Sequence, residues 1–287
     1  MRISFRRWML LLCAGLLLMG NAHFSFADEK TLVEARFTER ETYSRMIDVP
    51  GKGKMRYYAQ NDPLWEDLCY ERSGSGKRRP FRDSGCSPAS AAMAVASLIP
   101  ESDLCSIAAF GKREYSLCDC SLNATRCIHN HTRYILSSQV DYVRFLPLVF
   151  GDFATGNNIF GMYSRTAAQG TGSNYLTGIA QAYGLSLRVS ESLTEAYEAM
   201  DQGCAVIGLA SQGGAFTNTG HFLLMAHRDE EMLYILDPLY RLEYKTNGAK
   251  KLQILEPGLV AMRYEDVQAA LFRTFYILQP ETIGETE

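Results

Sequence analysis

Cys86 is the residue of this sequence best placed to act as a nucleophile. The segment SGCSPASAAMAVASLIP predicts a turn at Ser84-Gly85, a helix cap at Ser87, Pro88 at the first helical position and an alanine-rich helix after it. The unpaired N–H groups and the dipole of a helix N-terminus stabilise the charge of a thiolate. We therefore predict a reactive thiol at Cys86, with Gly85 leaving room for a substrate backbone and the Cys86 amide facing an oxyanion.

A structural disulfide is the alternative for Cys86. The sequence has eight cysteines, of which Cys13 falls in a segment that we expect to be removed on export. The other seven are an odd number, so they cannot all pair within one chain. Cys69 and Cys105 are possible partners of Cys86, but the position before a helix favours the nucleophile.

The base that such a thiol needs must come from a small set of histidines. Residues 28–287 contain four: His129, His131, His221 and His227. His221 follows the loop GGAFTNTG and begins the apolar run FLLMAH, which predicts a strand edge beside an access loop, and we predict that it is the base. His227 ends the same strand roughly 20 Å away, so we interpret it as a surface or core histidine.

Asp237 is the candidate for orienting the imidazole of His221. The segment MLYILDPLY predicts a strand that forms a hairpin with HFLLMAHR and ends at Asp237-Pro238, on a neighbouring ladder position. Asp-Pro also opens turns, so the dipeptide alone carries little weight. A cysteine, a histidine and an aspartate in this order, with the last two on adjacent strands, form a much more specific pattern than any one of them.

The elements that must position these residues predict an α+β fold. We expect a helix from Asp28 to about Met46, a linker, an exposed loop at RSGSGKRRP, the helix after Cys86, and a helical region over YILSSQVDYVRFLPLVF and GTGSNYLTGIAQAYGL. From about residue 186 strands dominate, with the helix SLTEAYEAMDQG among them: LRVS, CAVIGLA, HFLLMAHR, MLYILDP, RLEYK and FRTFYIL. This order indicates a helical first half, with the nucleophile at a helix N-terminus, packed on an antiparallel sheet.

Residues 1–27 predict a secretory signal peptide. MRISFRRW carries three arginines and no acid, an apolar run follows, and small residues surround Ser25 and Ala27. The run is shorter than the roughly 20 residues that span a bilayer, so we expect cleavage and no stable membrane insertion. The protein is then secreted, periplasmic or at the cell surface. We divide the remainder into a helix and linker at 28–55 and a catalytic domain at 56–287 with a cysteine-rich insert at about 101–135.

The charge excludes one class of partner. Removal of residues 1–27 takes three of the 29 basic residues and none of the 32 acidic ones, which leaves 26 basic residues and a net charge of −6. We therefore predict no nucleic-acid partner. The sequence also has no Walker-type or dinucleotide-binding glycine motif, so we predict no phosphate chemistry and no cofactor.

Five residues of the insert have side chains that can bind a metal: Cys118, Cys120, Cys127, His129 and His131. They supply enough ligands for zinc, although their spacing is not that of a familiar zinc module. An oxidising compartment favours disulfides instead, and without Cys86 six cysteines remain that can form three bridges. We predict disulfides and no metal, with zinc as the alternative. If Cys204 is an unpaired core thiol, one further cysteine is free as well.

These motifs resemble papain-superfamily peptidases related to the bacteriocin-processing, double-glycine-leader peptidases, family thirty-nine of the cysteine peptidases. The resemblance spans most of the mature chain and rests, in the family's order, on YYAQNDPLWEDLCY, SGCSPASAAMAVASL, IAQAYGLSL, GHFLLMAH and ILDP. It implies a papain-like fold in which Cys86 is the nucleophile, His221 the base and Asp237 the orienting acid. Ser87 stands where the family usually has a glycine, a small departure that the helix start tolerates.

The resemblance also implies that Gln60, in AQNDPLW, helps to form the oxyanion hole. An amide donor is suited to that task. Gln60 lies 26 residues before Cys86, a longer gap than in papain-type enzymes, and its alternative is a polar turn residue followed by a structural Trp65.

We therefore expect an exported thiol hydrolase, a cysteine peptidase that cleaves an amide bond of a peptide or protein substrate through an acyl-enzyme at Cys86. Two alternatives stay open. A catalytically inactive secreted binding module would keep the fold and use the cysteine-rich insert for recognition, and a cell-wall peptide hydrolase or acyl transferase would use the same three residues. Because no transport region follows the domain, we do not expect the leader-processing role, and the resemblance leaves the substrate open.

Overall fold

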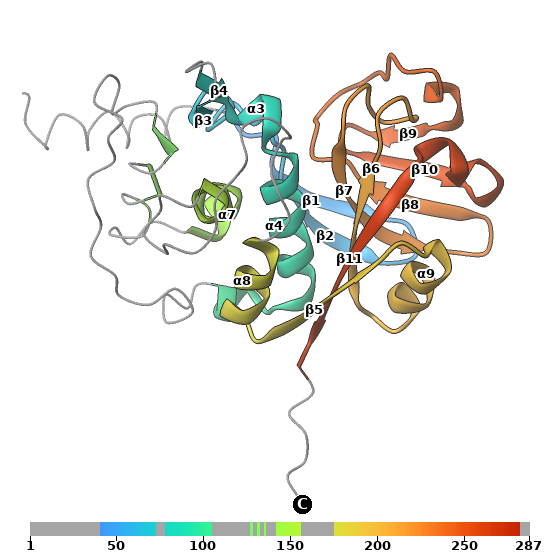
Figure 1. Cartoon of the computed structure of the whole chain (residues 1–287), viewed down its shortest axis with the longest axis horizontal. Coiled ribbons are helices and arrows are strands. Elements are labelled where there is room, and N and C mark those ends of the chain that lie inside the picture. Colours follow the sequence, from blue (N-terminus) through green and yellow to red (C-terminus); the bar gives the residue numbers. More distant parts are fainter. Residues whose placement is uncertain are drawn as a thin grey trace, which may run out of the picture. The chain divides into compact units, whose positions relative to one another are not determined.

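A seven-stranded antiparallel sheet is the central element of the structure (Figure 1), a computed structural model that describes residues 41–72, 78–104, 127–128, 131–132, 135, 142–155 and 175–281. The strand order is β5-β11-β6-β7-β8-β10-β9. With helices before it in the sequence, this sheet confirms the predicted α+β fold. Its strands are β5 (Leu185–Ser190), β6 (Ala205–Ala210), β7 (His221–Arg228), β8 (Met232–Leu236), β9 (Gln253–Glu256), β10 (Leu259–Arg263) and β11 (Phe272–Pro280).

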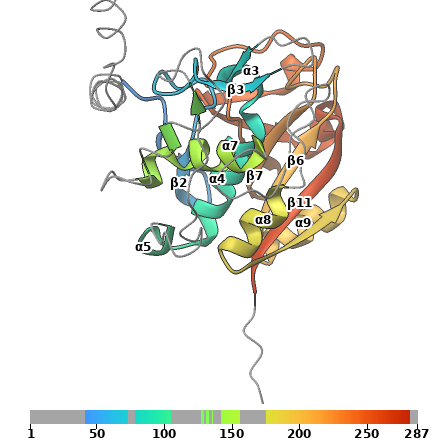
Figure 2. The same cartoon turned by 60° about the vertical axis from the view of Figure 1, so that its left-hand side comes forward.

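Helix α4 (Cys86–Leu98) is buried between the sheet and the other helices of the first half. It contacts β6 and β7 on one side and α7 (Leu146–Thr155) on the other, and α8 (Tyr175–Ala182) contacts α7. Figure 2 shows the same arrangement from a second direction. Every residue from Ser87 to Val95 is buried, and most are Ala or Ser, so the helix approaches its neighbours closely.

Short elements complete the described chain. The single-turn helices α3 (Phe81–Ser84) and α5 (Glu101–Leu104) flank α4, and the hairpin of β3 and β4 precedes α3. The strands of this hairpin are β3 (Cys69–Arg72) and β4 (Arg78–Pro80). The remaining elements are η3 (Tyr142–Phe145), α9 (Leu193–Asp201), η4 (Ala249–Lys251) and η5 (Tyr264–Ala270). The helical region predicted over residues 134–150 and 170–185 and the helix predicted over 192–203 are therefore present in the described parts of those segments.

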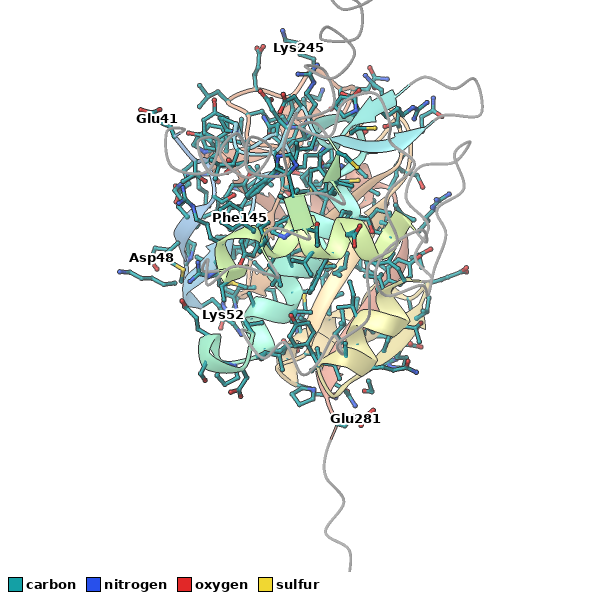
Figure 3. All side chains as sticks on the ribbon, turned by 90° about the vertical axis from the view of Figure 1, so that its left-hand side faces the viewer. Glu41, Asp48, Lys52, Phe145, Lys245 and Glu281 are labelled. Atoms are coloured by element: carbon teal, nitrogen blue, oxygen red, sulfur yellow. The ribbon has the colours of Figure 1, made fainter. Side chains whose placement is uncertain are left out.

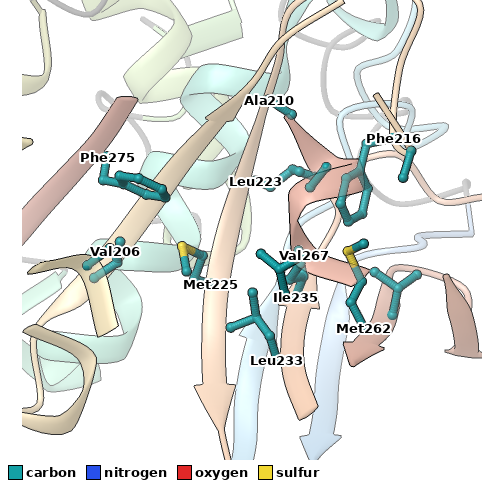
Figure 4. Close-up of a cluster of buried hydrophobic side chains, with 14 of the residues drawn as sticks. Val206, Ala210, Phe216, Leu223, Met225, Leu233, Ile235, Met262, Val267 and Phe275 are labelled. Atoms are coloured by element: carbon teal, nitrogen blue, oxygen red, sulfur yellow. The ribbon is translucent and has the colours of Figure 1, made fainter. Parts of the chain in front are cut away.

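The main apolar cluster lies between the sheet and the elements α9 and η5 (Figure 4). Alternate residues of one strand, such as Leu223 and Met225 of β7, point into it, as the period of two in a strand requires. All six residues of β6 are buried, which explains why CAVIGLA is an uninterrupted apolar run: helices cover both faces of this strand. The labelled members of the cluster are Val206, Ala210, Phe216, Leu223, Met225, Leu233, Ile235, Met262, Val267 and Phe275.

Residues 45–57 form a hairpin where a helix to about Met46 and a linker to residue 55 were predicted. Strand β1 (Arg45–Val49) pairs antiparallel with β2 (Gly53–Tyr57). In both strands the side chains alternate between exposed and buried positions. This period of two differs from the period of a helix. The buried side chains are Ile47, Val49, Met55 and Tyr57. The hairpin belongs to the compact unit that begins at Glu41, and the expected helix over 28–40 lies outside the described residues.

The observed sheet differs from the predicted one at two places. RLEYK, at 241–245, is irregular, because Arg241 and Tyr244 both turn toward Asp237 while Leu242 is 75% exposed. Strands β9 and β10 were not predicted at all. They extend the sheet beyond β8, and the alternation in β9 is only between exposed and half-buried positions, which leaves a weak pattern in the sequence.

The charged side chains of Glu41, Asp48, Lys52, Lys245 and Glu281 lie at the outline of the molecule, while Phe145 is inside (Figure 3). Within the parts of the chain that the structure describes, no helix has the length and apolar content needed to cross a membrane. The predicted signal peptide at 1–27 lies outside those parts.

Candidate functional site

Cys86 is the first residue of α4, so the helix begins earlier than the sequence predicted. Gly85 occupies the N-cap position, and no side chain caps the helix. The predictions of Ser87 as the cap and Pro88 as the first helical residue were wrong by two positions. Ser87 is buried, and its Oγ is hydrogen-bonded to the Tyr175 hydroxyl of α8 at 2.6 Å, so packing between helices has taken the place of capping.

Gly85 has a structural reason to be glycine. A Cβ at this position would overlap the ring of Phe81 and lie 2.7 Å from the Phe81 carbonyl oxygen. The backbone N–H of Gly85 also donates to that carbonyl at 2.6 Å. The missing side chain therefore allows α3 and α4 to follow each other in a tight turn that places Cys86 at the helix end.

Cys86 is a free cysteine, and the residue as a whole is partly exposed. Burial opposes ionisation of the thiol, but its hydrogen bond to His221, the charge of His221 and the backbone N–H groups of Phe222 and Ser87 lower the pKa of Cys86 below its ordinary value. The surroundings of the thiol therefore favour the thiolate. The alternative of a disulfide at Cys86 is not what the structure contains.

His221 and Asp237 form a buried pair next to this thiol. The imidazole Nε2 lies 2.7 Å from Asp237 Oδ1, and the two side chains are 4% and 0% exposed. The predicted hairpin brings them together: β7 begins at His221, β8 ends at Leu236, and the two strands pair antiparallel. Because Nε2 faces Asp237, the other ring nitrogen, Nδ1, is left for the thiol.

The charges in this pair shift both pKa values. Burial lowers the pKa of His221, but the charge and hydrogen bond of Asp237, followed by those of Cys86, raise it to about 9. Burial raises the pKa of Asp237, but His221, Arg241 and Tyr244 hold it below the ordinary range. The three shifts act in the same direction: each favours the charged form, a thiolate, an imidazolium and a carboxylate in a row.

The carboxylate of Asp237 is fully hydrogen-bonded. Besides His221, Oδ1 accepts the backbone N–H of Leu239 at 2.8 Å. The second oxygen, Oδ2, accepts from Arg241 Nη2 at 2.7 Å and from the Tyr244 hydroxyl at 2.6 Å. These four donors hold the acid in one orientation toward the imidazole.

Gln60 lies between the two halves of the site. Its backbone N–H donates to the Pro238 carbonyl at 2.6 Å, next to Asp237, and its side-chain Nε2 donates to the Arg82 carbonyl at 2.5 Å, four residues before Cys86. The residue is 3% exposed, so it is more than a surface turn residue. Nε2 carries a second hydrogen that this contact does not use.

The remaining sequence candidates lie elsewhere or outside the described residues. His227 is at the far end of β7, stacked on Tyr234, and close to Gly51 of the hairpin. Of the proposed metal cluster only Cys127 and His131 are described, and the His131 Nδ1 contacts the Cys127 carbonyl at 2.9 Å. No group of three or more potential metal ligands occurs among the described residues.

Sequence reasoning missed two residues that touch the acid, Arg241 and Tyr244. They follow Asp237 at i+4 and i+7, in a segment that the sequence misidentified as a strand. The sequence did contain a signal for them, because an arginine and a tyrosine that follow Asp-Pro closely can donate hydrogen bonds to a buried acid. Only the irregular path of the chain turns both of them to the same oxygen.

The comparison with protein families agrees with this geometry. The model of the Peptidase_C39 like family matches residues 53–256, a range that contains Gln60, Cys86, His221 and Asp237. The match confirms the resemblance and the papain-like fold that were inferred from the motifs. No curated protein sequence matches the chain significantly.

Proposed function

This chain belongs to the Peptidase_C39 like family, and we propose that it is an exported cysteine peptidase with Cys86 as the nucleophile, His221 as the base and Asp237 as the residue that orients the imidazole. The observation that carries the proposal is the buried His221–Asp237 pair beside a partly exposed cysteine at the start of a helix. The three groups lie in the order nucleophile, base and orienting acid.

Acylation follows from this order. The Cys86 thiolate adds to the carbonyl carbon of the scissile amide, and the carbonyl oxygen takes the negative charge. The His221 imidazolium then gives its proton to the amide nitrogen, the C–N bond breaks, and the amine leaves. Asp237 stays ionised throughout and holds Nε2, so that Nδ1 keeps facing the sulfur and the leaving nitrogen.

Deacylation runs through the same groups. After the amine has left, His221 is neutral and accepts a proton from a water molecule, whose oxygen adds to the thioester carbonyl. Collapse of this second intermediate breaks the C–S bond, releases the carboxylic acid and returns the thiolate and the imidazolium.

Gln60 is the side-chain donor for the oxyanion in this proposal. The second hydrogen of its Nε2 is not used by the Arg82 carbonyl, and the residue lies beside both Asp237-Pro238 and the segment that leads to Cys86. A donor held by a backbone carbonyl is ordered before the substrate binds, which is what stabilisation of a developing charge requires.

The proposed substrate is an amide bond in a peptide or protein outside the cytoplasm. The arginine-rich start of the chain, the apolar run and the small residues before Asp28 support export. Intact mass of the protein recovered from the secreted or periplasmic fraction tests this point. The proposal requires a mature chain that begins at Asp28, and recovery of full-length protein in the cytoplasm contradicts it.

The nucleophile is tested by brief treatment of the native protein with iodoacetamide across pH, followed by peptide mapping. We expect an adduct at Cys86 that forms well below pH 8.5, where an ordinary thiol is still protonated. His221→Ala slows the reaction, whereas His227→Ala, a change of the same size at the other end of β7, leaves it unchanged. Labelling with an ordinary thiol pH profile contradicts the proposal.

The reaction itself is tested with labelled unfolded casein and with peptidoglycan fragments as substrates. Release of new peptide termini by the wild type, and none by Cys86→Ala, supports the peptidase. Cleavage of peptidoglycan stem peptides alone narrows the function to a cell-wall hydrolase. An activated Cys86 that cleaves neither substrate favours the binding module or acyl transfer to an amine.

A further inference from the structure

The Asp237 carboxylate is held from the side opposite His221 by two groups of one short segment. Arg241 Nη2 and the Tyr244 hydroxyl donate to Oδ2, while Oδ1 is left for His221 Nε2 and the Leu239 N–H. Asp237 has no exposed surface, so neither oxygen is solvated directly. A buried carboxylate in this position needs a compensating charge besides that of His221, because His221 loses its charge during the reaction.

Arg241 supplies that charge. Its side chain is 24% exposed, and its Nη2 reaches the buried acid. The guanidinium carbon also lies 3.8 Å from the centre of the Tyr244 ring, a cation–π contact that holds both donors in place. The positive charge therefore remains near Asp237 in every step.

The same segment holds the loop that leads to His221. Arg241 Nη2 also donates to the Phe216 carbonyl at 2.8 Å, and the Phe216 ring packs edge-on against Tyr244 at 5.9 Å. Thr246 Oγ1 donates to the Ala215 carbonyl. Residues 241–246 thus connect the Asp237 turn to the loop between β6 and β7, and a displacement of either one moves the imidazole relative to the sulfur.

We propose that Arg241 and Tyr244 are positioning residues of the reaction: they fix Asp237 and the Phe216 loop so that His221 faces Cys86, and Arg241 sets the charge that the thiol and the imidazole experience. The inference rests on the proposed function, in which His221 is the base. The ionisable groups that face the His221–Asp237 pair are Cys86 from α4, Tyr57 from β2, and Arg241 and Tyr244 themselves.

The test is the pH dependence of Cys86 alkylation by iodoacetamide, measured on the full-length mature protein by peptide mapping, which needs no substrate. The profile has two inflections, one for formation of the thiolate and one for loss of the imidazolium proton. Arg241→Gln removes a positive charge near both groups, so we expect both inflections to move to higher pH by roughly half a unit to one unit. On the acid side, this shift slows alkylation by roughly threefold to tenfold at fixed pH.

Three variants separate charge from structure. Arg241→Lys keeps the charge, and we expect the inflections at their wild-type positions. Tyr244→Phe removes a donor to Asp237 without a change of charge, and we expect a smaller upward shift of the upper inflection. Arg228→Gln breaks another arginine–aspartate pair, the exposed one with Asp201, and serves as the matched control that shifts neither inflection.

The outcomes distinguish this inference from the function on which it rests. A wild type with an ordinary thiol profile overturns both. In another outcome the wild type has the low-pH profile, and the alkylation rate of Arg241→Gln falls at all pH values while its inflections stay in place. This result overturns the role that we assign to the charge of Arg241 and leaves the proposed function standing. If Arg241→Gln does not fold, Tyr244→Phe decides: an unshifted upper inflection overturns the inference.

Discussion

Asp237 and Asp62 are two buried carboxylates whose hydrogen-bond partners suit them to different tasks. Both side chains have no exposed surface. Asp237 accepts from an imidazole, a guanidinium, a phenol and one backbone N–H. Within the described chain the donors to Asp62 are neutral, namely the Leu64 N–H at Oδ1 and four donors of Thr42, Tyr43 and Ser44 at Oδ2.

The difference shows how a buried acid is used for chemistry or for structure. The partners of Asp237 include three charged or ionisable side chains, so its interactions change when His221 gains or loses a proton. The partners of Asp62 are mainly the backbone and hydroxyls of the segment before β1, so its interactions stay constant and tie that segment to the loop that carries Gln60. The two acids are also connected, because Tyr43 stacks on Tyr240 at 4.2 Å, three residues after Asp237.

The largest expected effect is on activity at Asp237. Asp237→Ala removes the group that orients His221 and leaves Arg241 without its acid, so we expect kcat/KM for casein to fall by roughly a thousandfold. Asp62→Ala serves as the comparison, and the activity of its folded fraction should stay within about threefold of wild type. Equal losses in the two variants, at matched folded fraction, would falsify the division between chemistry and structure.

The next effect is on stability at Asp62. Asp62→Ala leaves the half-buried donors of residues 42–44 and the buried N–H of Leu64 without an acceptor, and we expect the free energy of unfolding to fall by about 3 kcal/mol. Urea denaturation followed by far-UV circular dichroism measures it. A loss below about 1 kcal/mol would mean that water replaces the carboxylate and that the segment before β1 is only loosely attached.

The pH dependence of stability sharpens the description of Asp237 and His221. The pKa of His221 is raised to about 9, so its protonated form stabilises the fold; this contribution is complete below about pH 6.5 and is lost as the pH rises through about 9. In a Cys86→Ala background, where the thiol does not titrate, we expect a loss of about 2 kcal/mol between pH 6.5 and 10. Addition of His221→Gln should remove this slope.

Asp237 contributes with the opposite sign. Its pKa is held below the ordinary value of about 4, so its stabilising contribution is present above that pH and is lost as the pH falls below it. Urea midpoints measured from pH 5 to pH 2 should therefore fall less steeply in Asp237→Ala than in the wild type. Parallel curves would show that the acid is no more ionised in the folded state than in the unfolded one.

The smallest effect is expected at Tyr57, which is fully buried and experiences the charges of both acids. Its hydroxyl has no hydrogen-bond partner among the described residues, and burial, followed by the charge of Asp237, raises its pKa. Tyr57→Phe should change the free energy of unfolding by less than about 1 kcal/mol, in either direction, and leave kcat/KM unchanged. Tyr244→Phe is the matched tyrosine that does donate to Asp237, and it should cost more in both measurements.

The sequence by itself determined the class of fold, and it predicted Cys86, His221 and Asp237, which the structure brings together. The alanine-rich segment after Cys86 predicted a helix, and the apolar runs that begin at His221 and end at Asp237 predicted a hairpin, because helix and strand periods are local properties of the chain. The order of these motifs was enough for the family relation. The same reasoning failed at residues 45–57, where a short alternating pattern was read as a helix and a linker.

Only the tertiary structure decided how the site is held. The tight turn of Gly85 against Phe81, the two contacts of Gln60 with Arg82 and Pro238, and the donation of Arg241 and Tyr244 to Asp237 all join segments whose approach no local pattern encodes. Hydrogen bonds of buried side chains depend on positions in space, and those positions follow from the packing of the sheet and α4. For that reason the sequence predicted the reacting atoms, while the folded chain determined the charges around them.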